Sequence, residues 1–130
     1  MIAIDSSALI AIAWGEPEAD QCRAAIKTST VHLIGTPTLL ETRIVLTARL
    51  GSDLAAQTLT FLIPEGCQIV AFNDIHLTAA MAAFDRFGKG RHPASLNYGD
   101  CMAYAVARVA ACPLLYKGED FARTDIRSAL

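Results

Sequence analysis

The stretch MIAIDSSALIAIAW, residues 1–14, decides the fold class of this chain. Its first four residues form a short apolar run, which predicts a buried strand that ends at Asp5. The segment that follows has helical spacing, with Ser6 or Ser7 placed to cap the helix and Gly15 placed to end it. An apolar strand that leads at once into a helix is the repeating unit of α/β domains.

The same alternation continues along the rest of the chain. In TPTLLETRIVLTARLG, residues 36–51, Thr36 is placed to cap a helix and Pro37 to occupy its first turn. The sequence therefore predicts a three-layer α/β domain with a mainly parallel central sheet. The further strands are expected at 31–35, 67–72 and 113–116, and the further helices at 16–29 with Pro17 in the first turn, 36–51, 52–66 with Ser52 as cap, 73–88, and from Asn97 onward.

Length and composition limit the possible functions. With 130 residues, the chain is expected to form a single domain, 1–130, that needs no disulfide or structural metal. Hydrophobic residues make up 53% and charged residues 18%, which favours an apolar surface covered by a second copy or by another partner. No apolar run is long enough to cross a bilayer and the N-terminus lacks a basic region, so a cytoplasmic protein without a membrane partner is expected. The net charge of −2 means that contact with nucleic acid needs a local basic patch or bridging cations.

Four acidic residues occupy positions where a ligand site is expected. Ligands of open parallel sheets bind at the carboxyl ends of the strands. Asp5 follows the first strand, Asp120 lies just past the last one, and Glu41 and Asp100 interrupt helix faces that are otherwise apolar. Taken singly, each acid has a plainer explanation as a helix cap, a partner of an arginine or a turn residue, and Asp100 fits a capping box begun by Asn97.

Taken together, the acids indicate a metal site. Carboxylates that converge on one crevice repel by about 4 kcal/mol per close pair at an effective dielectric of about 20. A divalent cation removes that repulsion, and oxygen ligands with no histidine or cysteine beside them suit Mg²⁺ or Mn²⁺. Because such acid clusters are common machinery for phosphodiester cleavage, a metal-dependent nuclease is the leading hypothesis.

Two other functions stay open on the residues alone. A phosphoacceptor receiver domain also binds Mg²⁺ through acids at strand ends, and Lys117 fits the lysine that follows a late strand in such domains. A receiver, however, needs an aspartate directly at the end of its middle strand, where Asp74 comes too late. A non-catalytic binding module, in which every acid is a cap or an ion-pair partner, predicts no affinity for Mg²⁺.

Four stretches carry these acids in order: MIAIDSSAL (1–9), PTLLETRIVL (37–46), LNYGDCMAYAVAR (96–108) and PLLYKGEDFARTDI (113–126). Together they resemble the PIN-domain nucleases, and specifically the VapC-type ribonuclease toxins of bacterial toxin-antitoxin pairs. The resemblance implies a PIN-like α/β/α fold in which Asp5, Glu41, Asp100 and Asp120 bind Mg²⁺ or Mn²⁺. It also implies RNA cleavage that inhibits translation, a homodimer, and a VapB-type antitoxin that covers or enters the active site.

The resemblance leaves the fourth acid of the site open. In KGEDF either Glu119 or Asp120 fits, and Asp120 is favoured because it directly precedes Phe121. Asp125 is expected to support the site through water. Ser7 is placed to bond an acid or a metal-bound water, although the role of an ordinary helix cap is preferred for it.

An RNA substrate is a polyanion, so cations are expected on the rim of an acidic site. One group lies around the loop before the Asp100 helix and another flanks Asp120. The alternative is that these charges serve only solubility. The candidate phosphate contacts are Arg86, Lys89, Arg91 and His92 in the first group and Lys117 and Arg123 in the second.

Overall fold

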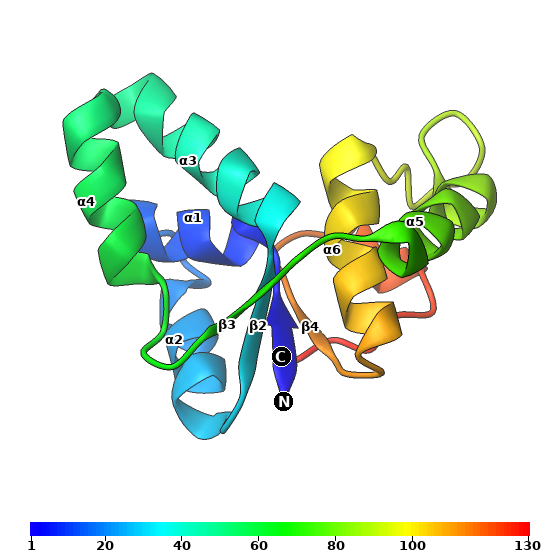
Figure 1. Ribbon diagram of the computed structural model, residues 1–130, viewed down its shortest axis with the longest axis horizontal. Coiled ribbons are helices and arrows are strands. Elements are labelled where there is room, and N and C mark those ends of the chain that lie inside the picture. Colours follow the sequence, from blue (N-terminus) through cyan, green and yellow to red (C-terminus); the bar gives the residue numbers. More distant parts are fainter.

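A computed structural model describes residues 1–130 and contains one sheet of four parallel strands in the order β3-β2-β1-β4 (Figure 1). The strands are β1 (Ile2–Ile4), β2 (His32–Gly35), β3 (Gln68–Val70) and β4 (Leu114–Leu115). The helices are α1 (Ser6–Trp14), α2 (Ala19–Thr28), α3 (Thr36–Leu50), α4 (Ser52–Leu62), α5 (Asp74–Phe87) and α6 (Tyr98–Val109), and the short 3₁₀ helix η1 (Phe121–Arg123) follows β4. None of these helices combines the length and the apolar character that a membrane crossing requires.

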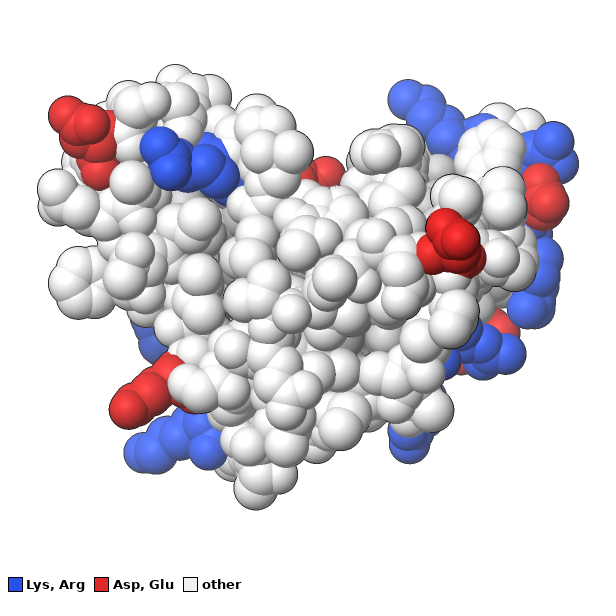
Figure 2. All heavy atoms as spheres, in the orientation of Figure 1, with Lys and Arg blue, Asp and Glu red and all other residues white.

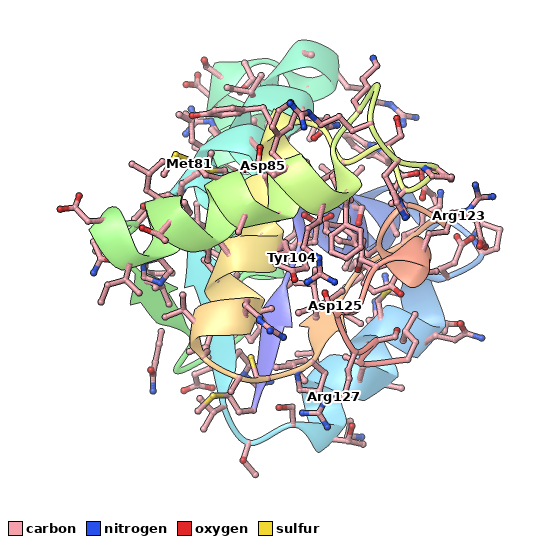
Figure 3. The ribbon with its side chains drawn as sticks, turned by 90° about the vertical axis from the view of Figure 1, so that its right-hand side faces the viewer. Met81, Asp85, Tyr104, Arg123, Asp125 and Arg127 are labelled. Carbon is pink, nitrogen blue, oxygen red and sulfur yellow. The ribbon has the colours of Figure 1, made fainter.

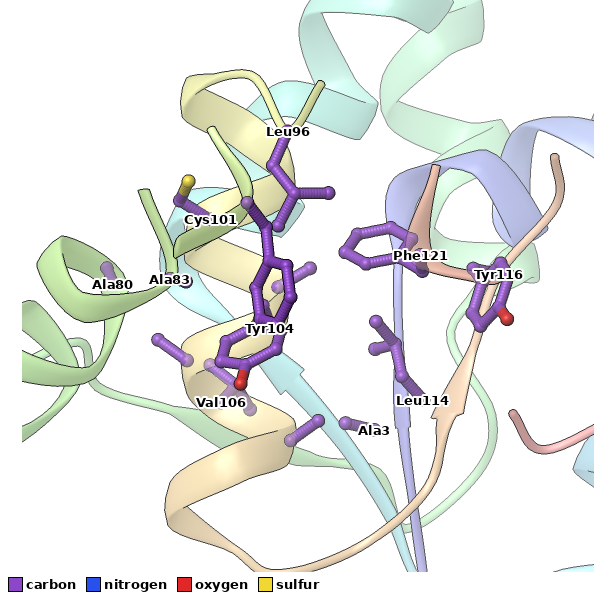
Figure 4. Packing of buried hydrophobic residues seen from close by; sticks show 14 of the residues in the cluster. Ala3, Ala80, Ala83, Leu96, Cys101, Tyr104, Val106, Leu114, Tyr116 and Phe121 are labelled. Atoms are coloured by element: carbon purple, nitrogen blue, oxygen red, sulfur yellow. The ribbon is translucent and has the colours of Figure 1, made fainter. Parts of the chain in front are cut away.

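The sheet lies between two layers of helices, with α1 to α4 on one side and α5 and α6 on the other (Figure 1). Each side has its own apolar core. The cluster beneath α6 includes Tyr104, Leu114 and Phe121 (Figure 4), and the cluster beneath α1 and α2 includes Leu9 and Ile34. The predicted three-layer α/β fold with a parallel sheet is therefore confirmed.

The junction between β1 and α1 differs in one detail from the prediction. Asp5, and not Ser6 or Ser7, is the N-cap of α1, because its carboxylate accepts the backbone N–H of Ser7 at 3.0 Å. Gly15 ends the helix in the left-handed conformation, as its position predicts. A carboxylate is at least as good an N-cap acceptor as a serine hydroxyl, so the first suitable side chain after the strand takes the cap.

Three other helix starts are displaced from the predicted positions. Pro17 lies in the turn before α2 and not in its first turn. The caps predicted from Thr36 and Ser52 are wrong, since both are the first helical residues and follow Gly35 and Gly51. Glycine offers no side chain, so no side-chain hydrogen bond caps the first N–H groups of α3 and α4.

The strand order places a crevice at the end of β1. Ala3 pairs with Leu33 of β2 on one side and with Leu114 of β4 on the other. The chain proceeds from β1 toward β2 and β3, and only later returns to the other side as β4, so the strand order reverses between β1 and β4. Ligands of open parallel sheets bind at such a reversal point, which is where Asp5 lies.

Candidate functional site

Acidic side chains lie at the base of a notch between α3 and α6, which Figure 2 shows at the upper edge of the molecule. Asp5 is the deepest of them, with an exposed fraction of 2%. Its Oδ2 accepts the backbone N–H and the hydroxyl of Ser7, whereas its Oδ1 is buried without a partner. Burial raises the pKa of Asp5 to about 6; the bonds from Ser7 oppose that shift, and the charges of Asp100 and Glu41 add to it. A buried, unpartnered carboxylate oxygen is stable as an anion only beside a cation.

Glu41 projects from α3 toward the first turn of α6. The hydroxyl of Ser6 donates a hydrogen bond to its Oε1. Its carboxylate also lies against Gly99, where an added Cβ atom would be 2.7 Å from Glu41 Cδ and would overlap Oε2. No arginine or lysine pairs with Glu41, so the ion pair considered for it is absent.

Asp100 closes the capping box that its spacing from Asn97 allows. Its Oδ2 accepts the N–H of Asn97 at 2.9 Å, and Asn97 Oδ1 accepts the N–H of Asp100 at 2.9 Å. Burial raises the pKa of Asp100, the bond from Asn97 lowers it, and the charges of Asp120 and Glu41 raise it again. The cap therefore occupies only one carboxylate oxygen and leaves Oδ1 without a hydrogen bond.

Asp120 lies in the exposed turn after β4, where it precedes η1 and makes no side-chain hydrogen bond. Of the two acids in this turn, Asp120 rather than Glu119 is the one whose charge raises the pKa of Asp100. The carboxylate of Asp125 accepts a hydrogen bond from Tyr104 at 2.6 Å.

Asp5, Glu41 and Asp100 share one arrangement. In each carboxylate, one oxygen accepts a hydrogen bond from the protein and the second oxygen accepts none. The first oxygen fixes the orientation of the group, and the second is available to a hard cation. No three such side chains form a ready-made metal-binding group in this arrangement, so the mutually repelling carboxylates would have to turn toward a shared ion.

Two of the candidate cations already have acidic partners. Lys117 Nζ forms an ion pair with Glu16 and lies 3.8 Å from Glu18. Arg86 Nη1 lies 3.2 Å from Asp125 Oδ2. These two side chains can bind phosphate only if they leave their present partners.

The cap role preferred for Ser7 is wrong, because Asp5 caps α1, and Ser7 instead bonds an acid of the notch. Its hydroxyl donates to Asp5 Oδ2 at 2.5 Å and accepts the backbone N–H of Lys117 at 3.0 Å. Ser7 therefore connects the acid at the end of β1 to the segment that follows β4, and it orients the deepest carboxylate of the notch.

The other candidate cations lie at the end of the molecule formed by α5 and the following loop, where Figure 2 shows lysine and arginine atoms gathered. Lys89 and Arg91 are exposed and have no acidic partner, although the Arg91 guanidinium lies 5.1 Å from the Phe84 ring centroid. His92 Nδ1 accepts the N–H of Ala94 at 3.0 Å, which gives this residue a structural role in the loop. Arg123 Nη1 lies 3.5 Å from the carbonyl of Pro93, so it spans from η1 to this loop.

Comparisons with known proteins agree on one family. The sequence model of the PIN-domain family matches residues 2–127 of this chain. Ribonuclease VapC30 of Mycobacterium tuberculosis is 42% identical over 123 residues, which are 95% of this chain and 94% of that protein. The sequence similarity thus covers nearly the whole of both chains.

Two solved structures share the fold at low sequence identity. The sarcin-ricin loop cleaving toxin VapC20 of Mycobacterium tuberculosis superimposes with a TM-score of 0.78 at 16% identity, covering 97% of this chain and 96% of that one. VapBC2 from Rickettsia felis, bound to a DNA fragment from its promoter, gives a TM-score of 0.72 at 13% identity, with coverage of 98% and 96%.

Proposed function

This chain belongs to the PIN-domain family, and we propose that it is the ribonuclease toxin of a VapBC-type toxin-antitoxin pair. It hydrolyses phosphodiester bonds of RNA and thereby inhibits translation. The 42% identity to ribonuclease VapC30 across nearly the full length of both chains supports this activity. The family match also supports a nuclease over a receiver domain as the function of this chain.

The catalytic proposal rests on three carboxylates in which only one of the two oxygens accepts a hydrogen bond from the protein. Asp5, Glu41 and Asp100 each have one oxygen oriented by the protein and one left free, beside the reversal point of the sheet. These residues would hold a divalent cation, for which Mg²⁺ or Mn²⁺ is the proposed identity, with Asp120 as the fourth acid. Such an ion, when bound, stabilises negative charge on the phosphate and makes water more acidic.

The protein itself orients these groups and attracts the substrate. Ser6 and Ser7 fix the carboxylates of Glu41 and Asp5 through hydrogen bonds. We assign the first RNA contacts to Lys89 and Arg91, because their charges are exposed and unpaired, so they can neutralise phosphates without breaking an ion pair. Arg86 and Lys117 stay secondary candidates, since both already bind carboxylates.

Two protein partners belong to the proposal. The fold is shared with VapBC2 from Rickettsia felis and with a toxin-antitoxin complex from Klebsiella pneumoniae, and these two structures support a VapB-type partner for this chain. A second copy of the chain is supported by large apolar side chains that α3, α5 and the start of α6 leave exposed. Examples are Leu40, Ile44, Met81, Phe84 and Tyr98.

The dimer has its own test. Sedimentation velocity at micromolar concentrations should give the mass of two chains. A Phe84→Glu variant places a charge among the exposed apolar side chains of α5 and should shift the protein toward one chain. If the unaltered protein sediments only as single chains, the dimer proposal is wrong. The nuclease proposal would not be affected.

The nuclease proposal is tested by cleavage of a labelled RNA with purified protein. Cleavage should require Mg²⁺ or Mn²⁺, stop on addition of EDTA, and be lost in Asp5→Asn and Asp100→Asn. Asp85→Asn is the matched control, because it removes an exposed carboxylate of α5 that forms no ion pair. If both site variants cut RNA as fast as the unaltered protein, the acidic residues are not the catalytic site.

A further inference from the structure

A second cluster of polar side chains connects the C-terminal segment to α5 and α6 on the side of the molecule shown in Figure 3. The hydroxyl of Tyr104 donates to Asp125 Oδ1 at 2.6 Å. Arg86 Nη1 lies 3.2 Å and Arg108 Nη1 3.8 Å from Asp125 Oδ2. One carboxylate of the C-terminal segment thus binds one side chain from α5 and two from α6.

The Tyr104 hydroxyl is the polar end of a residue that is otherwise packed in the core. The exposed fraction of Tyr104 is 4%, and Figure 4 shows its ring among the apolar side chains beneath α6. A phenol in such a place needs a hydrogen-bond acceptor, because an unmet donor in the core is costly. Asp125 provides that acceptor, and its own pKa is lowered, first by this bond and then by the two arginines.

The chain between Asp125 and Asp120 is short and internally bonded. Phe121 is 2% exposed and packs against Tyr116 with the ring centroids 5.1 Å apart. The N–H of Thr124 donates to the Phe121 carbonyl at 3.0 Å, and the Thr124 hydroxyl donates to the same carbonyl at 2.7 Å. Because these bonds restrict the residues between Asp120 and Asp125, we expect the position of Asp125 to influence that of Asp120.

The other side of Asp120 is also attached to the site. The N–H of Lys117 donates to Ser7 Oγ, whose hydroxyl in turn donates to Asp5. The turn that bears Asp120 is thus attached on both sides. On one side Lys117 bonds Ser7 at the acidic notch, and on the other side Asp125 bonds Tyr104. The attachment at Asp125 depends on side chains that lie outside the notch.

We propose that Tyr104 and Asp125, assisted by Arg86, are positioning residues that hold the turn bearing Asp120 at the edge of the acidic notch and so set the affinity of the acidic site for its divalent ion. This inference rests on the function proposed above. Its chemical basis is that a carboxylate held near its binding position loses less freedom when the ion arrives.

The test uses Mn²⁺ binding measured by isothermal titration calorimetry, without RNA. Tyr104→Phe and Asp125→Asn should weaken Mn²⁺ binding by about tenfold, in the range found for residues that orient metal ligands. Arg86→Gln changes a side chain that is 58% exposed, so this variant should fold, and it should weaken binding by a smaller factor. Thermal unfolding of each variant shows that the chain is folded at the titration temperature.

Two controls match the variants. Tyr116→Phe removes a hydroxyl that Figure 4 shows pointing away from the apolar cluster, and Asp85→Asn removes an exposed carboxylate of α5. Neither should change Mn²⁺ affinity.

Combination with Asp120→Asn separates positioning from a general structural effect. If Tyr104 acts through Asp120, Tyr104→Phe should not weaken Mn²⁺ binding further once Asp120 is neutralised. Fully additive losses, or variants that bind Mn²⁺ as the unaltered protein does, would overturn the inference while the proposed nuclease site stands. An unaltered protein that binds no Mn²⁺ would overturn both.

Discussion

The carboxylate of Glu41 lies directly against the backbone of Gly99, at the point where α3 meets the first turn of α6. Gly99 is followed at once by Asp100, so this contact brings two acids from different helices to the same notch. Any side chain at residue 99 would occupy the space of the Glu41 carboxylate. The absence of a side chain at residue 99 thus leaves room for the Glu41 carboxylate next to Asp100.

Gly99→Ala should therefore displace Glu41 and reduce RNA cleavage by at least about tenfold, comparable to the loss of a residue that orients metal ligands. Shortening the acid should make room for the added methyl group, so Gly99→Ala combined with Glu41→Asp should unfold at a higher temperature than Gly99→Ala alone. Equal unfolding temperatures for these two variants would show that the overlap is relieved in another way.

Ser6→Ala removes the hydroxyl that donates to Glu41 Oε1. Cleavage should fall by about tenfold to 100-fold because the carboxylate loses its orientation, whereas the thermal unfolding temperature should change little. Ser52→Ala is the control, since Ser52 is the exposed first residue of α4. A Ser6→Ala protein as active as the control would mean that this hydrogen bond has no catalytic role.

The pKa of Asp5 predicts a pH dependence of stability in EDTA. A folded-state pKa of about 6, against 3.8 for an ordinary aspartate, means that the folded protein holds this proton more tightly than the unfolded chain. The stabilisation from Asp5 is therefore complete below pH 4 and is lost as the pH rises through 6, a change of about 3 kcal/mol at about 1.4 kcal/mol per pKa unit.

Asp5→Asn should abolish that part of the pH dependence, because the amide can accept the same bonds from Ser7 without carrying a charge. Urea unfolding of both proteins in EDTA between pH 4 and pH 7 measures the difference. The variant should gain stability over the unaltered protein as the pH rises. A difference that stays constant across this range would contradict a buried, unpaired Asp5.

Lys89→Ala and Arg91→Ala should weaken RNA binding in EDTA, where no cleavage occurs. Each lost phosphate contact should reduce the slope of log affinity against log salt by about 0.7 for a single strand. Lys27→Ala is the control, because Lys27 is exposed in the last turn of α2, on the opposite side of the sheet. Fluorescence anisotropy at several salt concentrations measures the slopes. Slopes equal to that of the control would place the RNA path elsewhere.

The sequence sufficed to predict the fold class and the position of Asp5, because both follow from local patterns. An apolar strand, a carboxylate and a helix in direct succession place Asp5 at the carboxyl end of a parallel strand, and the strand order then locates the crevice. The capping box of Asn97 and Asp100 is equally local, since its two residues lie within one helical turn.

Contacts between distant segments could not be predicted in the same way. Ser6 was considered only as a helix cap, and its bond to Glu41 depends on how α1 packs beside α3. The ion pair of Lys117 with Glu16 joins the end of β4 to the turn before α2, so a cation assigned to the substrate is already engaged. Such pairings depend on tertiary packing, which no local pattern encodes.

The most direct test of the account is the position of Mn²⁺ in a crystal of the protein, located by its anomalous scattering. We predict a peak at the notch, within coordination distance of carboxylate oxygens from Asp5 and Asp100 and near Glu41. The peak should disappear in Asp5→Asn crystals grown with the same ion. A Mn²⁺ peak found only elsewhere, or a peak at the notch that persists unchanged in Asp5→Asn crystals, would contradict the claim that these carboxylates form the metal site of the nuclease.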